Sequence, residues 1–241
     1  EDNKIIINDF KGNSSNNKLF DKVYYLNLFN YKDRNNHMIN VLNQSKLSSI
    51  SERFPAVYGK KLKLEKCVKE KIITEYAKNK IESKSDKLYG VDMTYGGLGC
   101  AKSFKKLWLK ISKMNNNVLI LEDDVEIQEN ILDKINKLDI PNEWDIIYLG
   151  TTAFNINNEQ QYQKYNEDFV KILNGPIFGL FAYIINANTA KKLLKIFPLD
   201  YQTDTSIYQK LKLNCYRVID ALITTPPSGA PDAKFKTIIQ T

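Results

Sequence analysis

Three adjacent acids follow a short apolar run near the middle of the chain. Residues 118–125 read VLILEDDV, so Glu122, Asp123 and Asp124 come directly after four aliphatic residues. A short continuous apolar run is typical of a strand that is covered on both faces. Adjacent carboxylates repel one another unless a cation or hydrogen-bond donors lie among them. The acidic cluster, by which we mean Glu122, Asp123 and Asp124, therefore needs a partner of positive character.

The acidic cluster has two interpretations. Open α/β sheets bind ligands beyond the carboxyl ends of their strands, and Mg²⁺ and Mn²⁺ prefer carboxylate oxygens together with the oxygens of a bound diphosphate. This favours a metal–diphosphate site. The alternative is a solvated acidic turn that caps the next helix, because acids stabilise helix N-termini. Three acids alone favour the cap, so the rest of the sequence has to decide.

The composition limits the classes of function. The 241 residues are 43% hydrophobic and 26% charged, which is ordinary for a globular domain. The net charge of +7 suits anionic ligands. The lysines are scattered through helical segments rather than gathered in one basic block with aromatic residues, so we expect a phosphorylated small molecule and not a nucleic acid. The single histidine and three cysteines are too few for a zinc site.

Strands and helices alternate over most of the sequence. Runs of β-forming residues predict strands at 23–28, 53–59, 118–121, 144–150, 177–185 and 215–219. Apolar spacing and capping residues predict helices from Asp33 and over 60–85, 101–114, 131–138, 189–197 (capped by Asn188) and 204–211. This order predicts an α/β fold, in which a Rossmann-like, mainly parallel sheet is flanked by helices in a single domain.

The ends of the chain are predicted to differ from the rest. Residues 1–20 are polar and rich in asparagine, which predicts a loose arm or an edge strand. The domain itself is predicted over 21–225, and residues 226–241 form a tail in which Lys234 and Lys236 are placed to close over a diphosphate. No apolar run approaches the roughly 18 residues that a membrane-spanning helix needs, so we predict no span. The compartment stays open.

Glycines at 96, 97 and 99 precede the helix predicted at 101–114. They predict a tight turn that lets the backbone approach a ligand or another helix, although the spacing is not that of a dinucleotide-binding fingerprint. Lys102 and Ser103 would then open the helix, where a cation and free backbone N–H groups suit an anion. The alternative is a purely structural role for these glycines and for Cys100.

Several segments, taken in order, resemble the motifs of glycosyltransferase family 25, which includes lipopolysaccharide-biosynthesis transferases and procollagen galactosyltransferases. Residues 24–28 and 33–34 are similar to the family's first strand and basic turn, 53–59 to its RF-x-A-V-x-G segment, 97–103 to G-x-I-G-C-A-x-S-H, 119–125 to LILEDDV, 144–150 to WD-I-I-x-LG, and Gly179, 182–184 and Ala190 to G-x-x-A-Y-x-I…A. Each motif is weak by itself, but six in the same order make a specific signal.

The resemblance implies a GT-A fold, a UDP-sugar donor and Mn²⁺ (or Mg²⁺) bound at the acidic cluster. Asp124 is the expected direct metal ligand, and Asp123 is a second metal ligand or, with Glu122, holds the ribose or a metal-bound water. Asn27 and Arg34 are expected to contact the uridine or the diphosphate. For Arg34 the alternative is a surface salt bridge.

An inverting sugar transfer also needs a general base for the acceptor hydroxyl. Asp204 lies where members of the family carry an acid before an apolar helix, so we predict it as the base, with Asp200 as the second choice. The alternative for Asp204 is an N-cap, which aspartate often provides.

The sequence departs from the family pattern at two places. Phe104 stands where a histidine is expected. The resemblance also implies a C-terminal histidine that completes the metal shell, but the only histidine is His37, which is predicted to be a surface or boundary residue rather than a metal ligand. Any metal shell must then be completed by acids, phosphates or water. The predicted function is a metal-dependent hexosyltransferase (galactose or glucose) that uses a UDP-sugar and acts, with inversion, on a hydroxyl of a glycan or a hydroxylated protein. The alternatives are a non-catalytic nucleotide-sugar-binding module and another nucleotide-using transferase.

Overall fold

The computed structural model describes residues 19–83, 87–88, 90–152 and 154–226. Its main element is an eight-stranded sheet with the order β2-β1-β3-β8-β5-β9-β7-β6, and a two-stranded sheet pairs β10 with β4. In the order of the main sheet, the strands are β2 (Ser51–Pro55), β1 (Lys22–Asn27), β3 (Val118–Leu121), β8 (Ala182–Ile185), β5 (Ile146–Tyr148), β9 (Cys215–Val218), β7 (Phe169–Ile172) and β6 (Tyr162–Lys164), and the small sheet holds β4 (Glu126–Ile127) and β10 (Ile223–Thr224).

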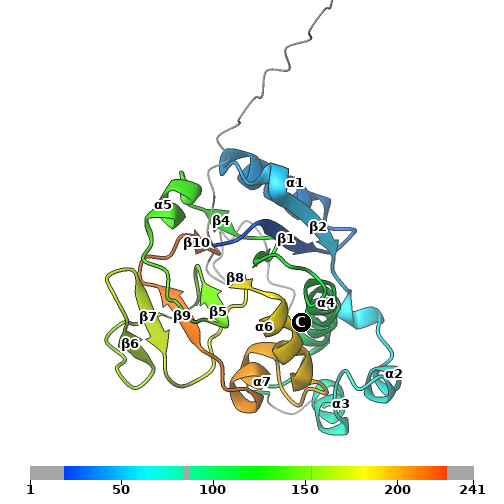
Figure 1. The fold of residues 1–241 in the computed structure, drawn as a ribbon. Helices are drawn as coiled ribbons and strands as arrows, with labels where there is room; N and C mark the ends of the chain where they lie inside the picture. Colours follow the sequence, from blue (N-terminus) through cyan, green and yellow to red (C-terminus); the bar gives the residue numbers. More distant parts are fainter. Residues whose placement is uncertain (1–18, 84–86, 89, 153, 227–241) are drawn as a thin grey trace, which may run out of the picture.

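Helices lie on both faces of this sheet (Figure 1). The α-helices are α1 (Lys32–Gln44), α2 (Leu64–Lys69), α3 (Glu75–Glu82), α4 (Tyr95–Ile111), α5 (Ile131–Lys137), α6 (Ala187–Leu193) and α7 (Thr203–Lys210). Short 3₁₀ turns add η1 (Ser48–Ile50), η2 (Gly59–Lys61) and η3 (Leu194–Ile196). The predicted α/β class, with a helix-flanked sheet in one domain, is confirmed.

The strand directions place the acidic cluster beside the end of the first strand. β1 pairs in parallel with both β2 and β3, and Tyr25 lies opposite Leu121. Parallel strands end at the same edge of a sheet, so Asn27 and Glu122 emerge next to each other. Farther along the sheet, β8 runs antiparallel to β3 and β5, and β7 and β6 are also antiparallel to their neighbours.

Alternate strand residues build one hydrophobic core on each face. On one face, α4 packs against α6, and Trp108 is fully buried beside Tyr183, to whose hydroxyl its Nε1 donates a hydrogen bond of 3.0 Å. On the other face, α1 and α5 contribute Met38 and Ile131 to the second core. Because β3 is buried on both faces, all four of its residues are apolar, as predicted.

The helix predicted over 60–85 is wrong in its extent. The chain leaves α2 at Glu70, passes through Lys71 at a φ of 52°, and forms a parallel bridge between Ile73 and Leu199. Thr74 then caps α3 by accepting a hydrogen bond from an amide N–H in the first turn. The apolar stripe in the sequence reflects two short helices that pack on the same core, rather than one long helix.

Smaller boundaries also differ from the predictions. Asn186, not Asn188, caps α6, with its side chain accepting a hydrogen bond from the Thr189 N–H. The strand expected over 53–59 begins earlier, at Ser51, and ends at Pro55, and η2 begins at Gly59. The predicted arm and tail fall almost wholly outside the described residues, as do Lys234 and Lys236.

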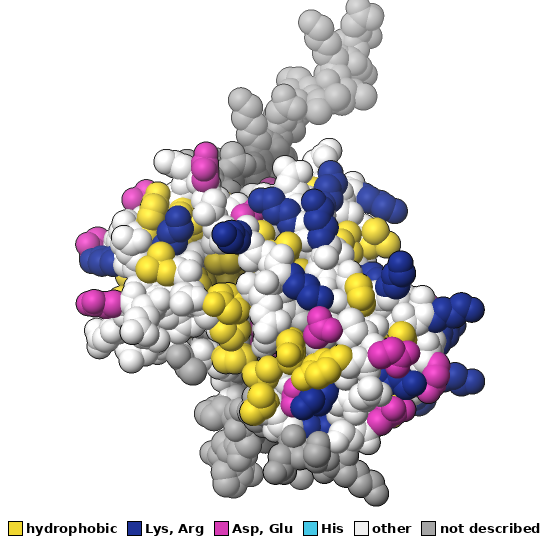
Figure 2. Space-filling model, turned by 90° about the horizontal axis from the view of Figure 1, so that it is seen from below, with side chains coloured by type: hydrophobic (Ala, Val, Ile, Leu, Met, Phe, Trp, Pro, Cys, Tyr) yellow, Lys and Arg dark blue, Asp and Glu magenta, His cyan; other side chains and the backbone are white. Residues whose placement is uncertain are grey.

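The surface carries basic side chains in a dispersed pattern. On the face shown in Figure 2, lysine and arginine side chains are spread widely, and acidic side chains lie among several of them. Several exposed lysines have an acidic partner, for example Lys110 with Glu52 at 2.8 Å. Within the described residues, we find no helix that is long and apolar enough to cross a membrane.

Candidate active site

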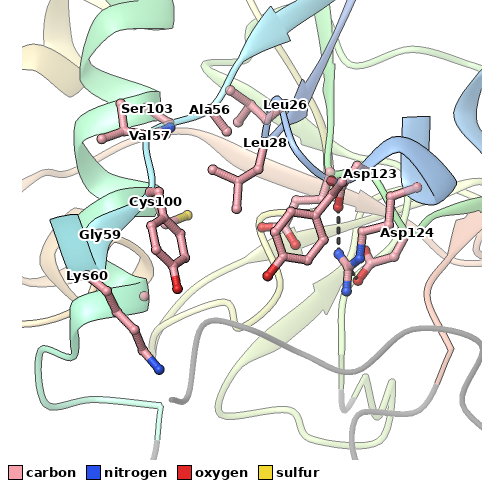
Figure 3. Close-up of a pocket in the computed structure, with 15 residues that line it drawn as sticks. Leu26, Leu28, Ala56, Val57, Gly59, Lys60, Cys100, Ser103, Asp123 and Asp124 are labelled. Atoms are coloured by element: carbon pink, nitrogen blue, oxygen red, sulfur yellow. Dashed lines mark hydrogen bonds and ion pairs between the residues drawn. The ribbon is translucent and has the colours of Figure 1, made fainter.

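The acidic cluster begins where β3 ends, and Asp123 is its buried anchor. Asn27 Nδ2 donates a hydrogen bond of 2.6 Å to Asp123 Oδ2, and Arg34 Nη1 lies 2.6 Å from Asp123 Oδ1. Both oxygens of Asp123 are therefore engaged by the chain itself. Asp123 and Asp124 lie side by side in Figure 3, with the ion pairs drawn as dashed lines. Asn27, Arg34 and Asp123, which the sequence predicts to contact the donor or the metal, thus lie together, and the contacts observed are those that they make with one another.

Arg34 is buried rather than part of a surface salt bridge. Only 5% of its surface is exposed, and its Nη1 also lies 3.1 Å from Asp124 Oδ2. Burial lowers the pKa of Arg34, but the charges of Asp123 and Asp124 outweigh this and raise it. A buried pair of this kind fixes geometry more than it adds stability. Arg34 thus holds both aspartates in place from the first turn of α1.

Glu122 and Asp124 lie where ionised carboxylates are disfavoured unless a further positive charge is present. One oxygen of Asp124, Oδ1, is buried and has no hydrogen-bond partner among the described residues. Burial, followed by the charges of Asp124 and Asp123, raises the pKa of Glu122 to about 8. Burial also raises the pKa of Asp124, although Arg34 opposes this. One arginine does not neutralise this many carboxylates, and the site as a whole favours an additional cation.

Asp204, on α7, lies within electrostatic reach of the acidic cluster. It belongs to the first turn of α7, whose cap position is Gln202, so the N-cap alternative for Asp204 is wrong. Burial raises the pKa of Asp204 to about 6, against hydrogen bonds from the backbone N–H groups of Gly179 and Thr205. The charge of Asp204 contributes to the raised pKa of Glu122, which places the two carboxyls in one electrostatic site.

The glycines form a helix rather than the predicted turn. α4 begins at Tyr95, and the Thr94 side chain caps it by accepting a hydrogen bond from the Gly97 N–H. A Cβ on Gly99 would lie 2.5 Å from the Val57 carbonyl oxygen, and one on Gly59 would lie 1.6 Å from the Tyr95 carbonyl oxygen. The glycines therefore let the chain after β2 lie directly against α4.

Ser103 stabilises the contact between α4 and the chain after β2 by two hydrogen bonds. Ser103 Oγ accepts a hydrogen bond of 2.8 Å from the Val57 N–H and donates one of 2.7 Å to the Gly99 carbonyl. Ser103 lines the pocket, but it lies inside α4 and does not open the helix as predicted. Its observed contacts are with the protein backbone, so it supports the pocket wall.

The pocket lies between this wall and the acidic cluster (Figure 3). Tyr31, Tyr58 and Lys60 line it together with the acids, and none of the three was predicted from the sequence. Tyr58 is 40% exposed, and Lys60 is also exposed. The signal that could have found them is their place in the turns directly after β1 and β2, at the edge of the sheet where ligands bind.

Two of the predicted residues lie elsewhere. Lys102 forms an ion pair of 2.9 Å with Glu70 and does not line the pocket. Asp200 accepts a hydrogen bond of 2.8 Å from Thr74 Oγ1 and lies 3.3 Å from Lys210 Nζ. The contacts of Lys102 and Asp200 are with other protein side chains, so neither residue belongs to the candidate site.

Phe104 and His37 are both buried in the structure. Phe104 is fully buried and stacks on Trp108 with ring centroids 5.5 Å apart, so it fills the core rather than the pocket. His37 is buried, not at the surface, and its Nε2 lies 2.8 Å from the Val125 carbonyl oxygen. It thereby supports the backbone that follows the acidic cluster. No group of three or more His, Cys, Asp or Glu side chains in metal-ligand geometry occurs among the described residues.

Comparison with known proteins identifies the family. The model of glycosyltransferase family 25 (LPS biosynthesis protein) matches residues 20–207, which include every element of the candidate site described above. The chain belongs to glycosyltransferase family 25. The resemblance inferred from the six motifs is thereby confirmed.

Curated relatives agree with this assignment. A glycosyltransferase 25 family member of Aedes aegypti is 29% identical over 202 residues, covering 80% of this chain and 31% of that protein. Procollagen galactosyltransferase 1-B of Xenopus laevis is 27% identical over 186 residues (75% and 29%). Procollagen galactosyltransferase 2 of Homo sapiens is 24% identical over 196 residues (75% and 29%). The chain thus spans less than a third of the length of these relatives.

Proposed function

We propose that this protein transfers a hexose, galactose or glucose, from a UDP-sugar to the hydroxyl of a glycan or of a hydroxylated protein side chain. The observation that carries the proposal is the acidic cluster, which faces a pocket lined by two tyrosines and a lysine. Membership of a glycosyltransferase family supports sugar transfer, and similarity to procollagen galactosyltransferases supports galactose. Because both oxygens of Asp123 are engaged by Asn27 and Arg34, Asp124 and Glu122 are the acids that would contact a ligand.

The donor set suits a hard divalent cation, Mn²⁺ or Mg²⁺. Oδ1 of Asp124 is buried without a hydrogen-bond partner among the described residues, and Arg34 holds the other oxygen of this carboxylate. A cation nearby would stabilise the ionised form of Glu122, which the site otherwise disfavours. We therefore assign Asp124 as the metal ligand, with Glu122 close to it, and expect phosphates and water to complete the shell. When bound, the metal supplies positive charge to the leaving diphosphate. Asp123, whose oxygens are both engaged, takes a positioning role in this proposal.

The pocket suits the nucleoside part of the donor. Its volume of about 190 Å³ is below the roughly 300–1,000 Å³ of typical ligand pockets, so it would hold only part of a nucleotide sugar. The rings of Tyr31 and Tyr58 offer faces on which uracil can stack. Lys60 would then contact a phosphate at the open side, and the hexose would lie over Glu122 toward Asp204.

Asp204 is the proposed general base. In the transfer, its carboxylate takes the proton of the acceptor hydroxyl, whose oxygen forms a bond to C1 of the hexose. The bond from C1 to the phosphate oxygen breaks, and UDP leaves with the electron pair, which inverts the configuration at C1. A base with a pKa of about 6 is ionised at neutral pH yet still basic enough to accept the proton.

The proposal is tested by assaying a panel of UDP-, GDP- and CMP-sugars for hydrolysis and transfer, with Mn²⁺ and with a chelator. We expect turnover of UDP-galactose or UDP-glucose that depends on the metal. The Asp124→Ala variant should lose UDP affinity in the presence of Mn²⁺, whereas Asp133→Ala, at an exposed acid of α5, should keep it. Metal-dependent UDP binding without any turnover would instead favour a non-catalytic binding module. Unchanged UDP and Mn²⁺ affinity in Asp124→Ala would refute the metal assignment.

A further inference from the structure

Tyr148, the last residue of β5, carries a buried hydroxyl group that the proposed mechanism does not use. Only 2% of the residue is exposed, and within the described residues its hydroxyl makes no hydrogen bond. Burial raises the pKa of Tyr148 well above its usual range, so the group stays protonated and can donate a hydrogen bond. Buried tyrosine hydroxyls usually have a partner. A hydroxyl that lacks one in the free protein is therefore available to a ligand.

A ligand can reach this hydroxyl, because Tyr148 lines a large hollow that we call the β5 hollow. Its volume is about 930 Å³, which is enough for more than one sugar unit. Tyr148 packs in the same core as Ile207 of α7, and Cys215 packs against that core, so the Tyr148 ring lies on the face of the sheet on which the hollow opens. The residues that line the hollow and bear on its chemistry are Tyr148, Asn174, Lys192, Asp204, Tyr208 and Lys212.

The sheet places Tyr148 on the same edge and face as the acidic cluster. Because β8 is antiparallel to both β3 and β5, the strands β3 and β5 run in the same direction and end at the same edge. Ile120 and Tyr148 share one core, and Glu122 follows Ile120 by two residues, so Glu122 is on the face of Tyr148. β5 is the second strand from β3, which corresponds to about 10 Å across the sheet. This spacing leaves room for the hexose of the donor beside a second sugar.

Asp204 joins the β5 hollow to the donor side. It lines the hollow, and beyond the larger effect of burial its charge contributes to the raised pKa values of both Glu122 and Tyr148. A hexose that extends over Glu122 therefore approaches the carboxylate that a molecule in the hollow also approaches. Donor and acceptor need this relation to a general base in a direct transfer.

One wall of the hollow offers groups that suit a sugar ring. Tyr208 is 44% exposed, and its hydroxyl donates a hydrogen bond to Asn174 Oδ1. The side chains of Tyr208 and Asn174 thus present an aromatic ring next to an amide. An aromatic ring can pack on the apolar face of a pyranose, while amides and hydroxyls make hydrogen bonds to its oxygens.

The charges around the hollow are largely compensated. Lys192 lies 2.6 Å from Asp145, and Lys210, which also lines the hollow, lies 3.3 Å from Asp200. Lys212 is exposed to solvent. The hollow therefore lacks a cluster of uncompensated charges among its described side chains, and recognition through hydroxyl groups fits it better than recognition through charge.

We propose that the β5 hollow binds the acceptor, that this acceptor is an uncharged saccharide, and that the Tyr148 hydroxyl donates a hydrogen bond to an oxygen of its terminal sugar. The inference rests on the proposed transferase function and narrows its acceptor to a saccharide rather than a protein side chain. The hydrogen bond from Tyr148 fixes the sugar ring beside Asp204. The proton of the reacting hydroxyl still goes to Asp204.

The test compares Tyr148→Phe with the parent protein in transfer from UDP-galactose and UDP-glucose with Mn²⁺. The neutral probes are methyl β-galactoside, methyl β-glucoside, lactose and cellobiose, methyl β-glucuronide is the charged match of the glucoside, and a peptide with hydroxylysine is the protein arm. Tyr148→Phe should raise the KM for the best neutral probe by on the order of tenfold, because one hydrogen bond is lost. UDP affinity and donor hydrolysis by water should match the parent's, because neither needs the acceptor.

The stability of the same variant separates this role from a structural one. Deleting a buried hydroxyl that has no partner should leave the midpoint of urea unfolding unchanged or raise it, whereas deleting one that the fold uses lowers it. Tyr183→Phe is the matched control, because the Tyr183 hydroxyl accepts a hydrogen bond from Trp108 Nε1 and does not line the hollow. It should unfold at a lower urea concentration and keep the parent's acceptor KM.

A second variant acts from the exposed wall of the hollow. Tyr208→Ala removes a ring that is 44% exposed, so it should fold and bind UDP like the parent, but its KM for the neutral probes should rise. Tyr165→Ala is its control, because Tyr165 is 46% exposed and does not line the hollow. This control should keep the parent's KM.

The outcomes separate the two proposals. Transfer to none of the neutral probes, better use of the glucuronide or of the peptide, or an unchanged acceptor KM in Tyr148→Phe overturns the assignment of the β5 hollow. If the parent hydrolyses the donor but uses no saccharide, only this assignment fails. A parent protein that neither binds UDP nor hydrolyses a UDP-sugar speaks against the proposed transferase function itself.

Discussion

Tyr58 is the pocket residue with the largest expected effect on nucleotide affinity. Its ring lines the pocket and is 40% exposed, so it is open to a ligand. Stacking of a base on an aromatic ring contributes roughly 1–3 kcal/mol. Tyr58→Ala should therefore weaken UDP binding, measured by calorimetry, by roughly 5- to 150-fold. Tyr165→Ala is the control, because Tyr165 is 46% exposed and does not line the pocket. Equal affinities of the two variants would contradict the stacking.

Asp204 should reveal its role through opposite effects on stability and activity. Its pKa in the folded protein is about 6, above its ordinary 3.8, so ionised Asp204 destabilises the fold above pH 6. This cost disappears as pH falls through 6 toward 4, where the folded state takes up a proton before the unfolded state does. Asp204→Asn should therefore stabilise the protein at pH 7.5, by at most about 3 kcal/mol, and not at pH 4.

The measurement is urea unfolding at both pH values together with the transfer rate. Asp204→Asn should lose roughly 10²–10⁴-fold in rate, and the parent's rate should fall as pH drops below about 6. Asp33→Asn is the matched control, since Asp33 is also an acid in the first turn of a helix but is exposed. A stabilised Asp204→Asn variant with full activity would remove Asp204 from the mechanism.

At the scale of elements, the close contact of α4 with the chain after β2 shapes the pocket. A Cβ on Gly99 would lie 2.5 Å from a backbone carbonyl, which cannot move without moving the loop that carries Tyr58. Gly99→Ala should therefore cost about 1–3 kcal/mol of unfolding free energy and weaken UDP binding as well.

Gly97→Ala is the comparison within the same helix. Its nearest neighbour would be the flexible Met93 Sδ at 3.3 Å, and alanine favours a helix over glycine by roughly 1 kcal/mol. Urea unfolding should find it close to neutral or stabilising. If Gly99→Ala were as stable as Gly97→Ala, the close contact would not be needed for the fold.

Local patterns predicted the elements well where one signal dominated. The apolar run of β3 marked a strand buried on both faces, and the order of elements gave the fold class. Local pattern was misleading at the glycines, where it predicted a turn instead of a helix. The reason for a glycine at 99 is the close approach of Gly59, some 40 residues away in the sequence. Local pattern also failed over 60–85, where the bridge of Ile73 to Leu199 interrupts a continuous apolar stripe.

In the candidate site, too, local sequence patterns indicated residues, whereas contacts between distant residues determine their roles. Asn27, Arg34 and the acidic cluster were found from motifs, but their roles depend on contacts across some 90 residues. No sequence pattern could say that Asp123 would be bonded through both oxygens, while one oxygen of Asp124 has no hydrogen-bond partner within the described residues. Tyr31, Tyr58 and Lys60 were missed because single residues in turns carry no periodicity, and only the pairing of β1 with β2 and β3 brings their turns to one edge.

For the molecule as a whole, the site ties together segments that are distant in sequence. β1, α1, the chain after β2, β3 and α7 each contribute at least one side chain to it. A ligand that contacts several of them binds only the folded chain, so it must stabilise the whole domain against unfolding. Thermal stability therefore reports on assembly of the site without requiring a known acceptor.

We expect UDP and Mn²⁺ together to raise the melting temperature by about 5–10 °C. A ligand at 100 times its dissociation constant adds about 2.7 kcal/mol, and 1 kcal/mol corresponds to roughly 2–4 °C for a domain of this size. Either component alone should give a smaller shift, because the aspartates of the acidic cluster and the diphosphate are both negative and need a cation between them. A chelator should reverse the shift, and Asp124→Ala should show none. A shift of equal size with the chelator present would mean that UDP binds without metal, through Lys60 and the tyrosines alone.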